Sequence, residues 1–225
     1  MSSSTLIALV IMVVVLVVIP VTVALYRSWK VPKAWSALQK KRGLDDETDD
    51  DVRGPTPNHL AGDLRGHDVE VWMDTDIAAR GKTGPPHAQY TNIEVPLQAD
   101  DDSRVGIKLK GVGTTIWRKM MTSPGGYRYK ADEMDDGGES DVDAETFDDR
   151  FAIAGRLSSS LRRALATPEI ADVIEELLSS SAELHIENGK LRYTEPGRVS
   201  REGRLKLLVD DIVELAVLID DQLQQ

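Results

Sequence analysis

In this 225-residue chain, the side chains that could take part in catalysis or metal binding are those of the histidines and of the acidic runs. The four histidines are scattered, at His59, His67, His87 and His185. None forms the i, i+4 pair or the His-Glu-x-x-His pattern of a helical zinc site. His67 and His87 could meet Asp68 in space, but their spacing does not show it. Each histidine is therefore predicted to lie on the surface or at a sheet edge.

The other patterns that resemble active sites lack essential parts. Gly81-Lys82-Thr83 resembles the end of a phosphate-binding loop, but Asp76 replaces its first glycine and Gly84-Pro85-Pro86 blocks the helix that should follow. Ser158–Ser160 has no Gly-x-Ser-x-Gly elbow around it. The chain has no cysteine, which excludes disulfides, Cys-ligated zinc and a thiol nucleophile. No catalytic residue, cofactor, nucleotide or metal is predicted, and a non-enzymatic role is favoured.

An acid-rich stretch over Ala131–Asp149 has the composition of a calcium-binding loop but not its ligand pattern. With Gly137 in the glycine position, Met134 falls where an oxygen ligand is required, and Asp143 replaces the final glutamate. The pattern fails, so this stretch is predicted to be a mobile loop. Cation-responsive regulation through it is kept as an alternative function.

The N-terminus carries the strongest pattern in the chain. Leu6–Leu25 has no charged residue, and as a helix it would be roughly 30 Å long, the thickness of a bilayer core. Residues 1–5 contain no basic side chain, and the apolar run is longer than that of a cleaved signal peptide. The sequence therefore predicts a single retained transmembrane helix over residues 6–25, preceded by a short extracytoplasmic tail.

The segment after this run predicts its orientation. Residues 26–42 hold six basic and no acidic side chains, so the positive-inside rule places the following domain in the cytoplasm, as in a bacterial inner-membrane protein. Nine residues of this basic arm are predicted to anchor the chain at the membrane interface: Tyr26, Arg27, Trp29, Lys30, Lys33, Trp35, Lys40, Lys41 and Arg42.

Charge is divided unevenly along the chain. The whole sequence has 27 basic and 38 acidic residues, and from Gly43 onward the counts are 21 and 38, a balance of −17. This deficit of cations argues against nucleic-acid binding and favours a basic protein partner. Residues 43–58 combine an acidic run with Gly54-Pro55-Thr56-Pro57 and are predicted to be an extended linker.

Alternating apolar residues predict a β-rich subdomain over residues 59–130. Strands are expected around Val69–Met73, Ile93–Leu97 and Val105–Leu109, with a hairpin between the last two closed by Asp100–Ser103. Pro96 suggests an edge strand. Shorter strands are expected at Thr114–Lys119 and Tyr127–Lys130.

Residues 131–146 are the acidic loop, and residues 147–225 are predicted to form a strand-helix-hairpin-helix subdomain. A strand is expected near Phe147 and Phe151, and a helix from Thr167-Pro168-Glu169, with threonine as its N-cap. Asn188-Gly189 is a strong hairpin signal. An amphipathic helix is expected from Ser200 almost to the end of the chain. Whether the two subdomains share one core is left open.

Several of these short motifs occur together in a familiar order. Phe147-Asp148-Asp149-Arg150-Phe151, then Leu165-x-Thr167-Pro168-Glu169 and the 184–193 hairpin, resemble a domain of uncharacterised bacterial membrane-anchored proteins. The upstream Gly62-x-x-x-Gly66 segment and Tyr90-Thr91 fit loosely. The resemblance covers roughly residues 60–223 and implies an α+β layout and a bacterial source. It implies no activity and no site residues.

The sequence thus predicts an α+β soluble domain behind a single N-terminal transmembrane helix. Its expected function is protein interaction or scaffolding at the membrane, with the lipid bilayer and a basic protein as partners. A membrane-tethered hydrolase is the enzymatic alternative. It would require two carboxylates, or His67 with an acid, to converge in a pocket with shifted pKa values. The oligomeric state is not predicted.

Overall fold

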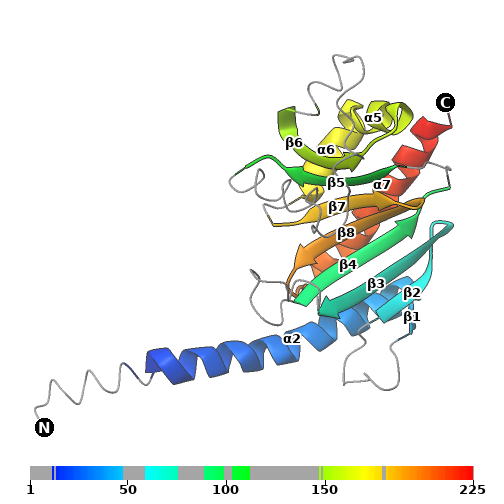
Figure 1. Ribbon diagram of the computed structural model, residues 1–225. Coiled ribbons are helices and arrows are strands. Elements are labelled where there is room, and N and C mark those ends of the chain that lie inside the picture. The colour runs from blue at the N-terminus through cyan, green and yellow to red at the C-terminus, as the bar shows by residue number, and fades with distance from the viewer. Residues whose placement is uncertain are drawn as a thin grey trace, which may run out of the picture.

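One antiparallel sheet with helices on one of its faces forms the body of the chain (Figure 1). The structure is a computed structural model, and it describes residues 12, 14–47, 59–75, 89–98, 103–111, 147, 149–178 and 181–224. The strand order is β1-β2-β3-β4-β8-β7-β5-β6. The strands are β1 (Asp45–Asp46), β2 (His59–Leu64), β3 (His67–Thr75), β4 (Gln89–Pro96), β5 (Arg104–Leu109), β6 (Phe151–Arg156), β7 (Glu183–Glu187) and β8 (Lys190–Pro196).

The helices pack on one face of this sheet or project from it (Figure 1). They are the short π-helical η1 (Val14–Val18), α2 (Ile19–Arg42), α5 (Ser159–Leu165), α6 (Pro168–Leu177) and α7 (Glu202–Leu223). Helix α7 packs on β4 and β8, while α5 and α6 pack on α7. The apolar stripe of α7 faces the apolar side of the strands, and both belong to one hydrophobic core. Figure 1 shows α2 leaving the body and projecting away from it.

The α+β class is confirmed, but the transmembrane helix predicted at Leu6–Leu25 is not. Among the described residues, no helix is both long enough and apolar enough to cross a bilayer. Helix α2 takes in only the end of the apolar run and then continues through the basic residues to Arg42. The prediction treated the apolar run and the basic arm as separate segments, whereas the structure joins them in one helix. Residues 1–11 lie outside the described residues.

The two predicted subdomains join in a single sheet. Strand β4 of the first pairs with β8 of the second, from Thr91↔Glu195 to Pro96↔Lys190. Strand β5 of the first pairs with both β7 and β6. Since strands from the two halves alternate in the sheet, residues 59–111 and 149–224 share one core.

Several local predictions are confirmed. Asn188 and Gly189 both have positive φ, 55° and 70°, and connect β7 to β8 as a tight hairpin. Helix α6 begins at Pro168 after Thr167, although the Thr167 hydroxyl donates to the carbonyl of Ala164 and does not cap the helix. Helix α7 begins at Glu202, slightly later than the predicted Ser200.

The predicted hairpin between residues 93–97 and 105–109 is wrong. Strand β4 pairs with β3 and β8, and β5 pairs with β6 and β7, so β4 and β5 are not neighbours. Strand β4 is also not an edge strand. Pro96 is tolerated because it is the last residue of the strand, where a missing N–H interrupts little of the ladder.

The predicted linker over residues 43–58 begins inside the fold. Gly43 ends α2 in the left-handed conformation (φ 67°), and Leu44 is buried in the core. Asp45 and Asp46 then form β1 against β2. Burial of Leu44 holds this part of the chain on the sheet. Residues 48–58, the strands expected at 114–119 and 127–130, and the acidic loop at 131–146 lie outside the described residues.

Candidate functional site

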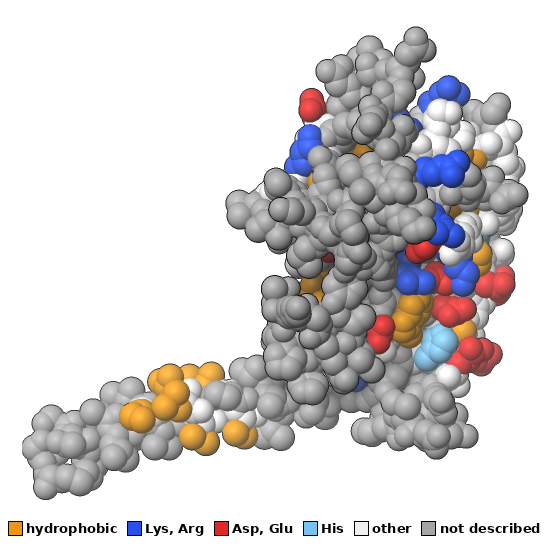
Figure 2. Space-filling view, in the orientation of Figure 1, with side chains coloured by type: hydrophobic (Ala, Val, Ile, Leu, Met, Phe, Trp, Pro, Cys, Tyr) orange, Lys and Arg blue, Asp and Glu red, His pale blue; other side chains and the backbone are white. Residues whose placement is uncertain are grey.

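Helix α2 and the segment before it differ sharply between their two ends. At the N-terminal end, exposed apolar side chains gather on the projecting segment (Figure 2). Leu16 is 62% exposed and Met12 is 61% exposed. We call the set the apolar tip, and it comprises Met12, Val15, Leu16, Val17, Val18, Ile19 and Val21. Such a concentration of exposed apolar surface marks an interaction site for a lipid or a protein.

The C-terminal end of α2 is embedded in the body. Trp35 has no exposed surface, and its indole Nε1 donates to the carbonyl of Val199 at 3.3 Å. The guanidinium of Arg198 lies 5.2 Å from the centroid of the same ring. Ala34 and Leu38 are buried beside Trp35, at the spacing of one helix face. This end of α2 is therefore part of the hydrophobic core.

Ion pairs reinforce this contact between α2 and α7. The ammonium of Lys41 lies 2.6 Å from Glu202, and the guanidinium of Arg42 pairs with both carboxylate oxygens of Asp210. The Arg42–Asp210 pair is mostly shielded from solvent, so it is stronger than an ordinary surface pair. These two pairs and Trp35 attach α2 to the body at three points.

The nine predicted interface anchors thus fall into three groups. Trp35, Lys41 and Arg42 contact the body of the protein itself. Lys33 and Lys40 are exposed on α2. The remaining four, Tyr26, Arg27, Trp29 and Lys30, belong to α2, but their side chains lie outside the described part of the structure. The predicted role of these nine residues at a membrane interface stays a prediction.

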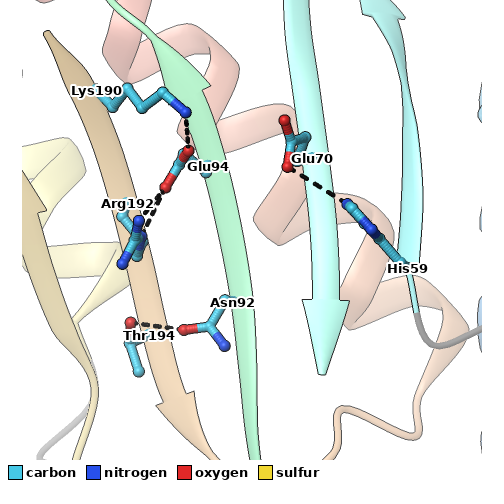
Figure 3. Close-up of polar contacts among 7 residues, drawn as sticks. All are labelled: His59, Glu70, Asn92, Glu94, Lys190, Arg192 and Thr194. Carbon is cyan, nitrogen blue, oxygen red and sulfur yellow. Dashed lines mark hydrogen bonds and ion pairs between the residues drawn. The ribbon is translucent and has the colours of Figure 1, made fainter. Parts of the chain in front are cut away.

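The sheet face away from the helices carries a cluster of paired polar side chains (Figure 3). Glu94 on β4 is only 4% exposed, yet its carboxylate is ionised and paired. Lys190 Nζ donates to one carboxylate oxygen at 2.6 Å, and Arg192 Nε donates to the other at 2.6 Å. Burial alone would raise the pKa of Glu94, but the hydrogen bonds from Lys190 and Arg192 lower it below its usual value.

Further polar contacts extend this charged face across the sheet (Figure 3). The Thr194 hydroxyl donates to Asn92 Oδ1 at 3.0 Å, and His59 Nε2 lies 3.3 Å from a Glu70 carboxylate oxygen. The guanidinium of Arg192 also lies 5.3 Å from the Trp72 ring centroid. We define the charged face by these residues together with Glu94 and Lys190.

A hollow of about 210 Å³ opens on the charged face near the β7–β8 hairpin. Its lining is Glu94, His185, Glu187, Asn188, Lys190 and Arg192. The hollow thus has two carboxylates and two cations, with Glu94 engaged by both cations. A general acid at neutral pH needs a carboxyl pKa raised toward neutrality, and the pKa of Glu94 is shifted the other way.

The described residues offer little else for catalysis. Among them, no group of three histidine, cysteine or acidic side chains is placed to hold a metal ion. His67 is buried at the start of β3, and His87 lies outside the described ranges. His185 is buried with its Nε2 3.3 Å from Glu183, which also pairs with Lys108. His185, Glu183 and Lys108 are therefore engaged with one another.

The sequence predicted neither the docking of α2 on the body nor the ion pairs of Glu94. Ala34, Trp35 and Leu38 do show helical apolar spacing within the basic arm, so the docking of α2 carried a readable signal. Alternation along β4 also separates Glu94 from Ile93 and Val95. The partners of Glu94 are 96 and 98 residues away, and no local pattern indicates that β4 pairs with β8.

Comparison with known proteins gives little further guidance. No family model and no curated protein matches the chain. Among solved structures, it is similar to the crystal structure of the mycobacterial trehalose monomycolate transport factor A, TtfA, with a TM-score of 0.49 and 12% sequence identity. The match covers 87% of this chain and 95% of that chain. At this level of similarity, neither fold nor function transfers to this protein.

Proposed function

We propose that this chain is a non-enzymatic adaptor at a membrane surface. The apolar tip binds lipid, α2 connects the tip to the sheet, and the acidic body is offered to a basic protein partner. The observation that supports this most directly is the contrast within one continuous helical segment, apolar and exposed at one end and built into the core at the other. The proposal requires lipid contact and does not require a membrane-crossing helix.

Charge favours lipid as the occupant of the apolar tip. Helix α2 has no acidic residue, and Arg27, Lys30 and Lys33 follow the tip in its sequence, so the segment next to the tip is cationic. An apolar surface beside Lys and Arg matches an anionic bilayer, whose acyl region takes the apolar side chains and whose headgroups attract the cations. The cytoplasmic leaflet of a bacterial membrane is rich in such lipids, and this location stays a prediction.

The length of α2 sets the spacing between lipid and body. Trp35 follows Ile19 by a helical rise of roughly 24 Å, which exceeds the depth of a headgroup layer. The body beyond Gly43 has a charge balance of −17 and is repelled by anionic lipid. The same charge attracts a basic partner and speeds its association. The tip and the body thus have opposite electrostatic preferences.

Vesicle flotation tests the lipid half of the proposal. The full chain is mixed with vesicles of neutral phosphatidylcholine, or of phosphatidylcholine with anionic phosphatidylglycerol, and centrifuged through a gradient. We expect it to float with both, and more completely with the anionic vesicles at low salt. The double variant Leu16→Asp/Ile19→Asp should lose at least tenfold in lipid partitioning, because charges replace exposed apolar side chains.

A matched control is available on the body. Leu207 on α7 is 60% exposed, so Leu207→Asp introduces one of the two negative charges of the tip variant, at an apolar site of similar exposure. This variant should float like the wild type. If the tip variant and the Leu207 variant float equally well, the apolar tip does not mediate lipid binding and the proposal is wrong.

The partner half is tested by cross-linking in native membranes. The full chain and a form lacking residues 43–225 are cross-linked, and captured proteins are identified by mass spectrometry. We expect one reproducible basic partner that requires the body and is released by salt. Capture that is the same with and without the body would contradict an interaction role for it.

A further inference from the structure

One row of side chains crosses the sheet at the end that carries the β2–β3 and β7–β8 turns (Figure 1). It lies on the face away from the helices, where each strand from β2 to β6 in sheet order places one residue beside its cross-strand neighbour. Extending the β3–β4 register by two residues brings Asp68 level with Pro96. We call this set the end row, and in sheet order it comprises Asp63, Asp68, Pro96, Lys190, Glu187, Arg104 and Arg156.

The two halves of the end row carry opposite charge. The half on β2, β3 and β4 has two acids and no cation, whereas the half on β8, β7, β5 and β6 has three cations and one acid, so the formal balances are −2 and +2. On the right of Figure 2, basic side chains accordingly gather toward β5 and β6, and acidic ones gather toward β2 and β3. A surface with halves of opposite sign is complementary to a second copy of itself.

Each end of the row places like charges side by side. Asp63 lies directly opposite Asp68, and Arg104 lies directly opposite Arg156. All four residues are exposed. Like charges at directly opposed positions of an antiparallel pair of strands destabilise that pair. Local departures of this kind from a favourable sequence are typical of functional surfaces.

The outer charges of the row have few partners within the chain. Among the described residues, the Asp68 carboxylate takes part in no ion pair or side-chain hydrogen bond. In the same part of the structure, Asp63 accepts only from a backbone amide of the β2–β3 turn, at 3.2 Å, and Arg104 donates only to a neutral amide oxygen, at 3.5 Å. Arg156 has a partner of its own, so Arg104 is the available cation at its end of the row.

The spacing of the charges allows two copies to pair. Asp68 on β3 and Arg104 on β5 each lie two strands away from β8, which carries Lys190. Neighbouring strands are about 4.8 Å apart, so each of the two charges lies about 10 Å from Lys190. A two-fold axis through Lys190 therefore reverses the row and brings Asp68 of one copy to Arg104 of the other, twice. Lys190 itself donates to Glu94 at 2.6 Å, which compensates its charge on the axis.

We propose that a second copy of this chain binds at the end row, in a two-fold dimer held by reciprocal ion pairs between Asp68 and Arg104. Asp63 places a second carboxylate beside Asp68, so each guanidinium meets two acids. Because the paired side chains are exposed, the dimer is sensitive to salt. This interaction goes beyond the adaptor role and depends neither on lipid binding by the apolar tip nor on a basic partner.

Sedimentation equilibrium of the full chain at low and high salt tests the dimer. Every protein carries Leu16→Asp/Ile19→Asp and no lipid is present, so the result is independent of lipid binding by the apolar tip. We expect a dimer at low salt that dissociates as the salt concentration rises. Asp68→Lys and Arg104→Glu should each weaken self-association at least tenfold, because each substitution sets like charges against one another at both contacts. General repulsion predicts the opposite for Asp68→Lys, which brings the formal net charge of −11 closer to zero.

Mixing the two variants separates a specific contact from an effect of total charge. Asp68→Lys has cations at both positions, and Arg104→Glu has acids at both. Neither should self-associate, but an equal mixture should form a heterodimer with two favourable contacts. The double variant Asp68→Lys/Arg104→Glu should dimerise with itself again, because its two charges are exchanged.

Matched controls reverse equally exposed charges elsewhere. Asp74→Lys lies on β3 at the other end of the strand, and Arg163→Glu lies on α5. Both should dimerise like the parent, and thermal unfolding checks that every variant is folded. A parent chain that stays monomeric at low salt would overturn the proposal. So would folded Asp68 and Arg104 variants that fail to form a heterodimer, or control variants that weaken the dimer to the same extent.

Discussion

The two faces of the sheet are built from the same strands but are stabilised by different interactions. On β4, Ile93 and Val95 point to the helices and are fully buried among apolar neighbours. Between them on the opposite face, Glu94 is nearly as buried but is held by two cations. The helix-covered face gains free energy from removing apolar surface from water, whereas the charged face must first compensate for desolvating its charges.

This difference indicates a division of roles between the faces. A core of Val, Ile and Leu tolerates several packings, but a buried carboxylate is satisfied in only one arrangement. Glu94 lies opposite Glu70 on β3 and opposite Arg192 on β8. A one-residue slip of β8 would turn Arg192 to the apolar face. Glu94 would then lose this cation and keep only Glu70, another acid, as its cross-strand neighbour. The apolar face thus supplies most of the stability, and the charged face selects the register.

The largest effect is expected on the apolar face. Ile93→Ala removes a fully buried side chain that lies between Val71 and Tyr193 in neighbouring strands. The free energy of unfolding should fall by about 3–4 kcal/mol, from lost burial and the cavity left behind. Urea denaturation followed by circular dichroism measures it. Asp74→Ala, exposed on the opposite face of β3, should change stability by less than about 0.5 kcal/mol.

A smaller effect with a distinct pH dependence is expected at Glu94. Glu94→Gln keeps the shape but removes the charge that Lys190 and Arg192 bind, so the free energy of unfolding should fall by about 2 kcal/mol at pH 7. Both cations remain partly exposed and can turn to solvent, which limits the loss.

The pH dependence of this difference follows from the lowered pKa of Glu94. A carboxyl whose pKa is lower in the folded than in the unfolded state stabilises the protein above its unfolded pKa, about 4.3 for glutamate. That stability is lost as the pH falls through the folded pKa. Wild type and Glu94→Gln should therefore differ at pH 7 and 5 and converge at acid pH in urea titrations. A difference that is constant with pH would show that the charge of Glu94 is not what stabilises the face.

The same contrast explains which features were readable from the sequence. The apolar face follows from alternation, and strands around Val69–Met73, Ile93–Leu97 and Val105–Leu109 are found where they were predicted. The Asn188-Gly189 hairpin is local and was predicted correctly. The pairing of β4 with β8 was not, since it joins residues about a hundred positions apart and depends on competition among all strands. Glu94 and its two cations become a site only through that pairing.

The N-terminal error has a different cause. The predicted transmembrane helix was based on the hydropathy of Leu6–Leu25 alone. The helix in the structure continues through the basic arm to Arg42. Trp35 fits an interfacial aromatic by composition, but its place in the core depends on Val199, 164 residues away, and on the packing of α2 against α7. Composition gave the chemistry of these side chains, and tertiary structure determined what each one contacts.

The smallest effect is expected at the solvent-exposed rim of the charged face. His59 and Glu70 are 3.3 Å apart, and their side chains are 32% and 47% exposed. Water and salt screen a pair of this kind, so Glu70→Gln should change the free energy of unfolding at pH 7 by less than about 0.5 kcal/mol. Urea denaturation in parallel with Glu94→Gln measures the contrast, since both substitutions remove one carboxylate from the same face. Equal losses in the two variants would mean that burial of Glu94 does not set its contribution, and the division of roles between the faces would then be wrong.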